Sequence, residues 1–239
     1  MIEVQCLASG SSGNCYRITD GESPLLLDCG IPWRQIQQDL NFQASALSGI
    51  LVSHEHMDHC RAVKKAVRSG VTCYASKETA EALGVSGHRV KIVRQLEQFR
   101  IDLWTVLPFD TVHDAAGSIG FLLAHKRGDK LLYLTDTAYC KYRFKGLTHI
   151  LVEANYSLDI LRQNVIDGSV PTELKNRLLK THMGLETVKG FLRANDLGRV
   201  REIWLLHLSS ENSNSARFKR EIQALTGKMV YVAGEAGGA

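Results

Sequence analysis

The sequence lacks several features that would assign it to a special class of protein. No apolar run reaches the roughly 18 residues that a membrane-spanning helix needs, and the N-terminal stretch MIEVQCLASG has no charged leader. The six cysteines form no CxxC pair, so their spacing suggests neither a disulfide framework nor a zinc ribbon. There is no internal repeat and no Pro- or Ser-rich linker. These absences predict a cytoplasmic protein without a membrane segment, in which residues 1–239 form a single domain.

The sequence also has little excess charge of either sign. Its 29 Lys and Arg residues exceed its 25 Asp and Glu residues by four. That mild positive balance would tolerate a phosphate-bearing substrate, but it is not the concentrated basic tail of a dedicated nucleic-acid binder. With 44% hydrophobic and 23% charged residues, the composition is that of a globular protein with a packed core. Composition alone leaves the function and the oligomeric state open.

Hydrophobic periodicity predicts a mixed α/β fold. Short apolar or alternating runs predict strands at 2–7, 14–19, 25–28, 50–52, 72–75, 101–107, 119–124, 130–135, 150–153, 203–207 and 229–232. Apolar residues three or four apart predict helices at 33–40, 61–67, 77–83, 185–194 and 216–225. Strands interleaved with helices, without strict βαβ repetition, favour two sheets packed face to face with helices outside, a four-layer αββα sandwich. The ending GEAGGA, residues 234–239, is expected to be a frayed tail.

One short segment concentrates potential metal ligands. His54, His56, Asp58 and His59 lie within six residues, after the strand expected at 50–52 and before the helix expected at 61–67. Imidazole nitrogens suit zinc, iron and manganese, and a carboxylate adds the negative charge that a second divalent ion needs. Given the frequencies of His and Asp in this chain, the pattern HxHxDH is expected by chance on the order of once in a thousand such sequences. The spacing therefore predicts a metal site rather than solvent-exposed or helix-capping histidines.

Four ligands on one turn cannot fill two coordination shells, so further ligands must come from elsewhere in the chain. His113 lies in a polar loop after the strand expected at 101–107, while Asp136 and His207 lie at the ends of later predicted strands. Each of the three could instead have a structural role, such as a buried carboxylate that hydrogen-bonds a loop. Taken together, the three positions favour metal ligation.

The pattern HxHxDH, followed by a His, an Asp and a His at strand ends, resembles the metallo-β-lactamase superfamily over nearly the whole chain. The resemblance implies the four-layer αββα sandwich of that superfamily and two divalent metal ions. It would assign one ion to His54, His56 and His113, the other to Asp58, His59 and His207, with Asp136 bridging both. Such ligands suit Zn²⁺ or Mn²⁺, and Fe²⁺ is also possible.

Four further segments narrow the resemblance to the YycJ/WalJ-like branch of this superfamily. They are LASGSSGNCY at 7–16, LDCG at 27–30, EAN at 153–155 and HLSSEN at 207–212. This branch is associated with phosphodiesterases of the 5′-to-3′ exonuclease type. Two positions depart from its pattern, because Ser213 follows Asn212 where a second asparagine is usual, and Gly184 stands where a serine is usual. Glycine is still an acceptable helix N-cap, at a cost of roughly a few tenths of a kcal/mol.

The chemistry of a two-metal centre predicts roles for other polar residues. Two divalent ions can share one water and provide a hydroxide that attacks phosphorus. Asp58 would bind metal and also orient that hydroxide through its second oxygen, while Asp28 would hydrogen-bond a ligand imidazole. His182, which precedes the helix expected at 185–194, is the candidate proton donor to the leaving alkoxide. A surface histidine without a catalytic role is the alternative for His182.

The Gly-rich segment SGSSGN at 9–14 lacks the lysine of a nucleotide-binding P-loop, so no nucleotide cofactor is expected. The segment is interpreted either as a tight turn or as a loop whose backbone amides contact a phosphate. In the second case the substrate-binding residues would be Ser12, Asn14, Asn155 and His182, since asparagine offers a neutral donor that does not compete for metal.

The leading hypothesis for the function is a metal-dependent phosphodiesterase that uses a metal-bridged hydroxide. The family resemblance implies a nuclease of the 5′-to-3′ exonuclease type, with nucleic acid, and DNA in particular, as the substrate. The same chemistry also serves carbonyl centres, so a small-molecule hydrolase acting on a cyclic phosphate, a thioester or a lactam is the alternative. A non-catalytic binding module that has kept the fold is the third interpretation.

Overall fold

The apolar runs of the sequence form most of the expected strands, and the chain divides into two compact units. The structure is a computed structural model that describes residues 2–235, so most of the tail expected at 234–239 lies outside the described residues. Within the described residues, the first unit comprises 2–110, 115–129 and 234–235, and the second comprises Thr111–Asp114 and Lys130–Ala233. The single domain expected for residues 1–239 stays a prediction.

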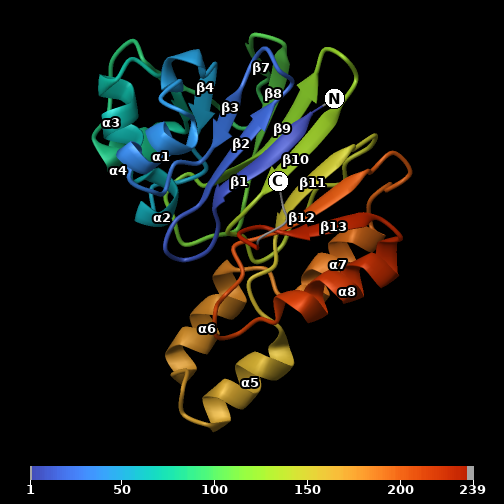
Figure 1. The fold of residues 1–239 in the computed structure, drawn as a ribbon. Helices are drawn as coiled ribbons and strands as arrows, with labels where there is room; N and C mark the ends of the chain where they lie inside the picture. Colours follow the sequence, from blue (N-terminus) through green and yellow to red (C-terminus); the bar gives the residue numbers. More distant parts are fainter. Residues whose placement is uncertain (1, 236–239) are drawn as a thin grey trace. The chain divides into compact units, whose positions relative to one another are not determined.

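The first unit contains a six-stranded sheet in the order β1-β2-β3-β4-β5-β6 (Figure 1). The first three strands pair antiparallel, whereas β3 to β6 run parallel to one another. The strands are β1 (Glu3–Ala8), β2 (Cys15–Thr19), β3 (Leu25–Leu27), β4 (Gly49–Leu51), β5 (Cys73–Ala75) and β6 (Val90–Ile92), the last of which was not expected. The helical segments of this unit are α1 (Trp33–Asp39), the 3-10 turn Ala44–Ala46, α2 (Met57–Cys60), α3 (Val63–Arg68) and α4 (Lys77–Leu83).

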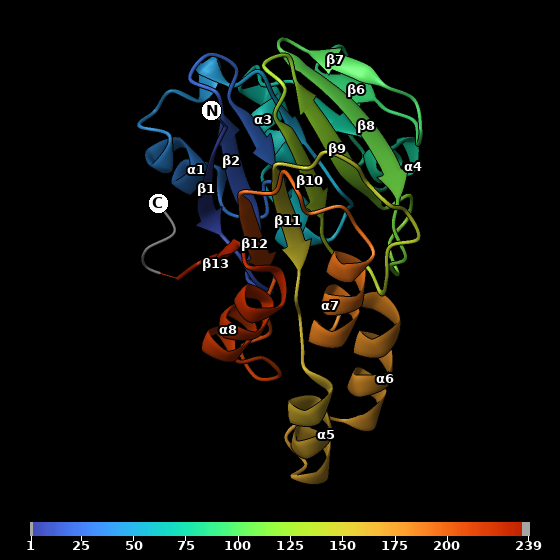
Figure 2. The ribbon, with the colours of Figure 1, turned by 90° about the vertical axis from the view of Figure 1, so that its right-hand side faces the viewer.

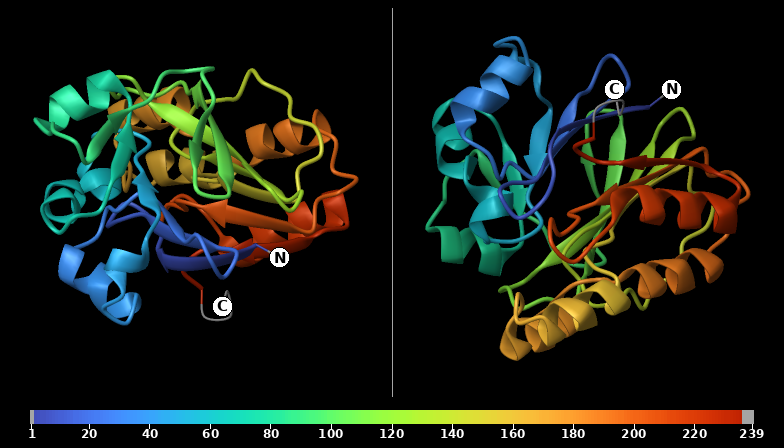
Figure 3. Two further views of the ribbon diagram at one scale, coloured as in Figure 1. Left: turned by 90° about the horizontal axis from the view of Figure 1, so that it is seen from above. Right: turned by 60° about the horizontal axis from the view of Figure 1, so that its bottom comes forward.

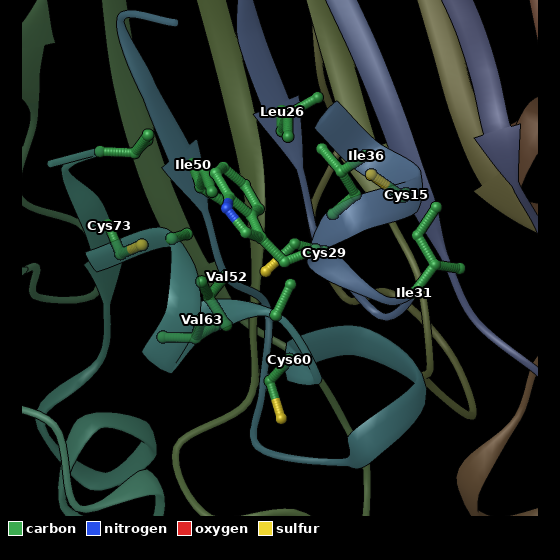
Figure 4. Close-up of a cluster of buried hydrophobic side chains, with 14 of the residues drawn as sticks. Cys15, Leu26, Cys29, Ile31, Ile36, Ile50, Val52, Cys60, Val63 and Cys73 are labelled. Carbon is green, nitrogen blue, oxygen red and sulfur yellow. The ribbon is translucent and has the colours of Figure 1, made fainter. Parts of the chain in front are cut away.

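A buried apolar cluster joins this sheet to its helices. Ile36 of α1 and Val63 of α3 pack with Leu26, Ile50 and Cys73 of the strands (Figure 4). The spacing of apolar residues in the two helices places them on one face, which is why the sequence predicted helices here. Burial raises the pKa of the Cys73 thiol to about 12, so that this sulfur behaves as a small hydrophobic group at neutral pH.

The strand expected at 101–107 is wrong. The structure has two antiparallel strands there, β7 (Phe99–Ile101) and β8 (Trp104–Asp110), and β8 pairs in turn with β9 (Ile119–His125). The chain reverses at Asp102, whose φ of 48° lies in the left-handed region that aspartate tolerates better than most residues. Because apolar residues continue on both sides of this turn, the periodicity gave no sign of it.

The second unit is built on four parallel strands, paired in the order β10-β11-β12-β13. They are β10 (Lys130–Leu134), β11 (His149–Glu153), β12 (Glu202–Leu206) and β13 (Met229–Val232). Helix α8 (Ser215–Thr226) packs against β13 and beside α7 (Leu185–Arg193) (Figure 3). Since the carboxyl ends of parallel strands meet at one edge of a sheet, the residues that follow these strands lie together.

Two helices of the second unit were not expected from the sequence. Helices α5 (Leu158–Ile166) and α6 (Thr172–Thr181) follow one another closely and contact each other (Figure 2). Leu161 and Val170 form a small apolar cluster here with Tyr156. The segment TELKNRLLKT of α6 has few apolar residues, so its helical periodicity is weak. In the first unit, the helix expected at 61–67 differs from the observed one. The structure has two short helices there, α2, which begins inside the histidine motif, and α3, which ends at Arg68.

Among residues 2–235, no helix combines the length and the hydrophobicity that crossing a bilayer requires.

Candidate functional site

The histidine motif of the first unit occupies the loop after β4 and the start of α2. His54 is buried, and its ring centroid lies 4.8 Å from that of His56 and 4.2 Å from that of His59. Asp58 lies in the first turn of α2 and is partly exposed. The loop and the start of α2 thus present three imidazoles and a carboxylate, and their predicted role as metal ligands stays a prediction.

Asp28 orients one of these imidazoles. Its Oδ2 accepts a hydrogen bond from Ser53 Oγ at 2.8 Å and lies 2.7 Å from His59 Nδ1, and its Oδ1 accepts the main-chain N–H of Ser53 at 2.7 Å. Asp28 is fully buried and has a φ of 58°, so the chain turns sharply at the end of β3. Because His59 Nδ1 faces this carboxylate, Nε2 is the nitrogen left for a metal ion. The contact is the one expected for Asp28, and its role toward a metal ligand stays a prediction.

Asn14 ties the Gly-rich segment to the histidine motif. Its Nδ2 lies 3.1 Å from His59 Nε2 and 3.4 Å from Asp58 Oδ2, and its main-chain N–H donates to the Asp58 carbonyl at 2.7 Å. The same side chain closes its own loop, because Nδ2 donates to Gly10 O and Oδ1 accepts from Gly10 N, both at 3.0 Å. Asn14 is fully buried, whereas Ser12 is exposed on the turn. Of the two residues of this segment that were predicted to bind substrate, Asn14 is therefore enclosed by protein and Ser12 is open to solvent.

Gly30 permits this close packing of the Gly-rich segment and the motif. A Cβ at this position would lie 1.7 Å from the main-chain oxygen of Asp58, a separation that no side chain can adopt. The main-chain N–H of Gly30 donates to the Asn14 carbonyl at 2.8 Å. The glycine of the LDCG segment is therefore required by geometry, because any larger residue at position 30 would push the motif away from Asn14.

In the second unit, four potential ligands converge at the carboxyl edge of the parallel strands. Asp136 lies two residues after β10, Glu153 ends β11, His207 directly follows β12, and His182 directly follows α6. Each of the four offers a ligand atom within 4.8 Å of those of the others. Asp136 and His207 have φ values of 41° and 51°, so the chain turns sharply at both. This edge brings together three of the residues that the sequence analysis singled out.

Glu153 is the member of this group to which the sequence analysis gave no role. It is fully buried, and its Oε2 accepts the main-chain N–H groups of Thr137 at 3.0 Å and Met183 at 3.1 Å. Its Oε1 lies 2.5 Å from His182 Nδ1 and 3.4 Å from His207 Nδ1. A charged residue directly after the apolar residues 150–152 was the available signal, since buried carboxylates need partners.

His182 and His207 are held next to each other. Their rings are stacked, with centroids 5.4 Å apart and planes 7° from parallel. The side chain of Asn155 holds His207, because its Nδ2 donates to the His207 carbonyl at 2.9 Å and lies 3.1 Å from His207 Nδ1. Asn155 thus contacts His207, a predicted metal ligand. Its contact with substrate stays a prediction.

The pKa values of His182 and Glu153 shift in opposite directions. Burial alone would lower the pKa of His182, but the carboxylates of Glu153 and Asp136 together outweigh it and the pKa is raised. Burial would raise the pKa of Glu153, yet the same histidine reverses that effect and the pKa is lowered. The two side chains therefore stabilise each other as an ion pair, with the His182 proton on Nδ1 directed at the carboxylate.

A hydrogen bond fixes the position of the ring proton in His113, which belongs to the same unit. Its Nδ1 lies 2.9 Å from the Thr181 carbonyl, which fixes the proton on that nitrogen and leaves Nε2 as the electron-pair donor. Its Nε2 lies 3.6 Å from Asp136 Oδ2. Burial lowers the pKa of His113, which favours the neutral form that a metal requires.

The chain has close relatives among known proteins. The family model of the β-lactamase superfamily domain matches residues 24–208. Exodeoxyribonuclease WalJ of Streptococcus pneumoniae is 30% identical over 227 residues, which cover 87% of this chain and 81% of that protein. Exodeoxyribonuclease YycJ of Bacillus anthracis is 28% identical over 255 aligned positions, covering 98% of this chain and 93% of that protein. The chain belongs to the metallo-β-lactamase superfamily.

A solved structure confirms the fold. The metallo-β-lactamase fold protein YhfI of Bacillus subtilis superimposes with a TM-score of 0.73 at 14% sequence identity, over 97% of this chain and 96% of that one. The predicted class, an α/β fold with sheets flanked by helices, is therefore correct. Together with the His and Asp cluster of the second unit, membership of this family indicates that the protein binds divalent metal ions.

Proposed function

We propose that this chain is a metal-dependent phosphodiesterase that degrades DNA, a nuclease of the 5′-to-3′ exonuclease type. The observation that carries the proposal is the match of 87% and 98% of the chain to two proteins named exodeoxyribonucleases. The side chains support it, because they combine neutral imidazoles and carboxylates in the way that two-metal phosphodiesterases require.

The proposed ligands of two divalent ions, Zn²⁺ or Mn²⁺, are His54, His56, Asp58, His59, His113, Asp136 and His207. Two of the imidazoles fit this role by their hydrogen bonds, since His59 faces Asp28 and His113 faces Thr181 through Nδ1, leaving Nε2 as the ligand atom. When bound, such ions lower the pKa of water toward neutrality and offset the negative charge of the phosphate.

Three side chains of the protein, those of Asp58, His182 and Glu153, are proposed to control proton transfer. Asp58 is partly exposed, so its carboxylate can accept a hydrogen bond from the attacking water and direct it at phosphorus. His182 donates a proton from Nε2 to the leaving oxygen, because its Nδ1 is directed at Glu153. Glu153 keeps the imidazole cationic until that transfer, as the raised pKa of His182 indicates. His182 also contacts the substrate in this role.

The remaining predicted substrate residues divide into two kinds. Asn14 and Asn155 contact proposed metal ligands, so their effect on the substrate would pass largely through His59 and His207. Ser12 is exposed at the tip of the Gly-rich turn, where its hydroxyl is accessible to a phosphate oxygen. Ser12 is therefore the residue of this segment that we assign to direct substrate contact.

The test is a cleavage assay on end-labelled DNA. Single- and double-stranded oligonucleotides with a 5′ phosphate and a 3′ label are incubated with the protein and Mn²⁺ or Zn²⁺, alongside bis-p-nitrophenyl phosphate. We expect progressive shortening from the 5′ end and release of p-nitrophenol. Asp136→Asn should lower both rates at least about a hundredfold. The matched variant Asp196→Asn, which changes an exposed carboxylate of the same unit, should leave them unchanged.

Three other outcomes contradict the proposal. Intact DNA and intact bis-p-nitrophenyl phosphate with every divalent metal would exclude phosphodiesterase activity. Rapid turnover of a cyclic phosphate, thioester or lactam by a protein that leaves DNA intact would identify a small-molecule hydrolase. A protein that purifies without stoichiometric metal, as measured by elemental analysis, and is unaffected by Asp136→Asn would be a non-catalytic binding module.

A further inference from the structure

A pocket in the second unit has no part in the mechanism described above. Its volume is about 370 Å³, and it lies between the loop 139–143 and helix α7. The loop contributes Tyr139, Lys141, Tyr142 and Arg143, and the helix contributes Gly190 and Phe191. A volume of this size falls within the range of roughly 300–1,000 Å³ that is usual for pockets that bind small molecules.

The loop combines aromatic rings with positive charge. The Tyr139 side chain is 52% exposed, and Lys141 and Arg143 are also exposed. The Lys141 Nζ atom lies 5.2 Å from the centroid of the Tyr142 ring, which is a cation–π arrangement. The sequence has no acidic residue between Asp136 and Glu153, so the charge of this stretch is of one sign. Aromatic rings interleaved with cations are the features with which proteins bind single-stranded nucleic acids.

One of the residues lining the pocket is an exposed glycine that packing does not explain. Gly190 lies inside α7, where glycine weakens a helix relative to alanine. A Cβ added to Gly190 would meet no atom of the described residues within 4 Å, so no neighbour requires its absence. A side chain at this position would instead take up space in the pocket. The absence of a side chain at Gly190 therefore leaves this part of the pocket open.

The loop is anchored to the proposed catalytic group. Thr137 donates its main-chain N–H to Glu153 Oε2 at 3.0 Å and its hydroxyl to the Tyr139 carbonyl at 2.8 Å. Tyr139 follows Asp136 by three residues. A ligand held against Tyr139 is thus connected through two hydrogen bonds to the carboxylate that holds His182.

We propose that this pocket, here called the stacking pocket, binds an unpaired nucleotide of a single DNA strand. The base stacks on the ring of Tyr139, and the adjacent phosphates contact Lys141 and Arg143. Stacking is tolerant of sequence because every base has an aromatic face, so the pocket serves a nuclease that acts on any sequence. This inference rests on the proposed nuclease function and names the part of the substrate that the second unit recognises.

The affinity of the full-length, metal-loaded protein for single-stranded DNA tests the stacking pocket. The probe is a phosphorothioate oligonucleotide, which resists cleavage, with a 3′ fluorescein whose anisotropy reports binding. Tyr139→Ala should weaken binding about tenfold through the lost stacking, while Tyr139→Phe should restore it. Lys141→Gln with Arg143→Gln should reduce the slope of log affinity against log salt by about 1.4, at about 0.7 for each lost phosphate contact. The control pair Lys64→Gln with Lys65→Gln removes the same charge from α3 and should change neither quantity.

Gly190→Leu separates a binding role from a structural one. We expect a thermal midpoint equal to or above that of the wild type, because leucine favours the helix, together with DNA binding weakened about tenfold. A stable variant that binds single-stranded DNA as the wild type does would overturn the stacking pocket. So would equal affinity for a hairpin-capped duplex, whose bases cannot stack on a protein ring.

The two proposals fail in distinguishable ways. If the wild type cuts DNA and hydrolyses bis-p-nitrophenyl phosphate while the Tyr139→Ala and Gly190→Leu variants bind normally, the stacking pocket is wrong and the nuclease stands. If the wild type hydrolyses neither substrate but the variants lose DNA binding as expected, the pocket stands and the proposed chemistry is wrong.

Discussion

The two units prepare their proposed metal ligands in different ways. In the first unit, four ligands come from one turn of the chain, and the Gly-rich segment packs against that turn through Asn14. In the second unit, Asp136 and His207 are far apart in sequence and meet because the strands before them run parallel. Yet each unit holds one imidazole in the same manner, with a fully buried carboxylate facing its Nδ1 atom: Asp28 for His59 and Glu153 for His182.

The two carboxylates, Asp28 and Glu153, nevertheless contact imidazoles with different proposed roles. Asp28 faces a proposed metal ligand, so it should act on metal affinity. Glu153 faces the proposed proton donor, so it should act on the rate of the chemical step. The same residue type in the same kind of contact therefore predicts two separable defects.

The largest effect is expected from Glu153→Gln. The amide nitrogen of glutamine would face His182 Nδ1 and disfavour a proton there, so His182 would lose its cationic form. General-acid catalysis contributes roughly a hundredfold or more, so kcat on DNA should fall by about that factor while metal content stays stoichiometric. The measurement is steady-state kinetics with elemental analysis of the same sample.

The pH profile sharpens this prediction. Glu153 raises the pKa of His182, so activity that needs the protonated imidazole is lost only as the pH rises through that raised value. In Glu153→Gln the pKa falls, and residual activity should be lost at lower pH than in the wild type. Glu202→Gln, on the neighbouring strand β12, is the control and should keep the wild-type profile. An unshifted alkaline limb in Glu153→Gln would remove Glu153 from the proton transfer.

A smaller effect, on metal binding, is expected from Asp28→Asn. Asparagine tolerates the φ of 58° at this position, so the backbone should be retained. Loss of the carboxylate behind His59 should weaken metal binding by about 10- to 100-fold, measured by competition with a chelator. Activity at saturating metal should recover most of its wild-type level, in contrast to Glu153→Gln.

The first unit offers a matched control for Asp28. Asp20 Oδ2 lies 2.9 Å from His125 Nε2, in a buried pair that has no contact with the histidine motif among the described residues. Asp20→Asn should therefore lower stability without changing metal affinity. If both variants bind metal as the wild type does, Asp28 has only a structural role.

The comparison also explains which parts of the site the sequence revealed. The motif HxHxDH was recognisable because its ligands are contiguous, and Asp28 because it ends an apolar strand. His113, Asp136 and His207 followed from the resemblance and from their places after strands. The partnership of Glu153 with His182 was not predictable, because the two residues are 29 positions apart and meet only through the turn that follows α6.

Tertiary packing accounts for the other elements that sequence periodicity missed. Helix α6 exposes most of its residues and therefore has no strong apolar stripe. The turn at Asp102 lies between two runs that both contain apolar residues, and no glycine or proline marks it. The proposed stacking pocket is lined by Tyr139 and Gly190, which are 51 positions apart in sequence and border one pocket only in the folded chain.

The smallest effect is expected from Gly184→Ser, which restores the residue usual in the YycJ/WalJ-like branch. Serine would cap α7, for which Gly184 provides no side chain, and would add roughly a few tenths of a kcal/mol of stability. However, a Cβ here would lie 2.7 Å from Cε2 of Tyr156, and such overpacking costs about 1–3 kcal/mol. The contact should outweigh the cap, so the free energy of unfolding in urea should fall by about 1 kcal/mol. In a Tyr156→Ala background the ring is gone, and the same substitution should then be neutral or stabilising. An equal loss of stability in both backgrounds would mean that the backbone at the start of α7 requires glycine at position 184, and that the contact with Tyr156 does not.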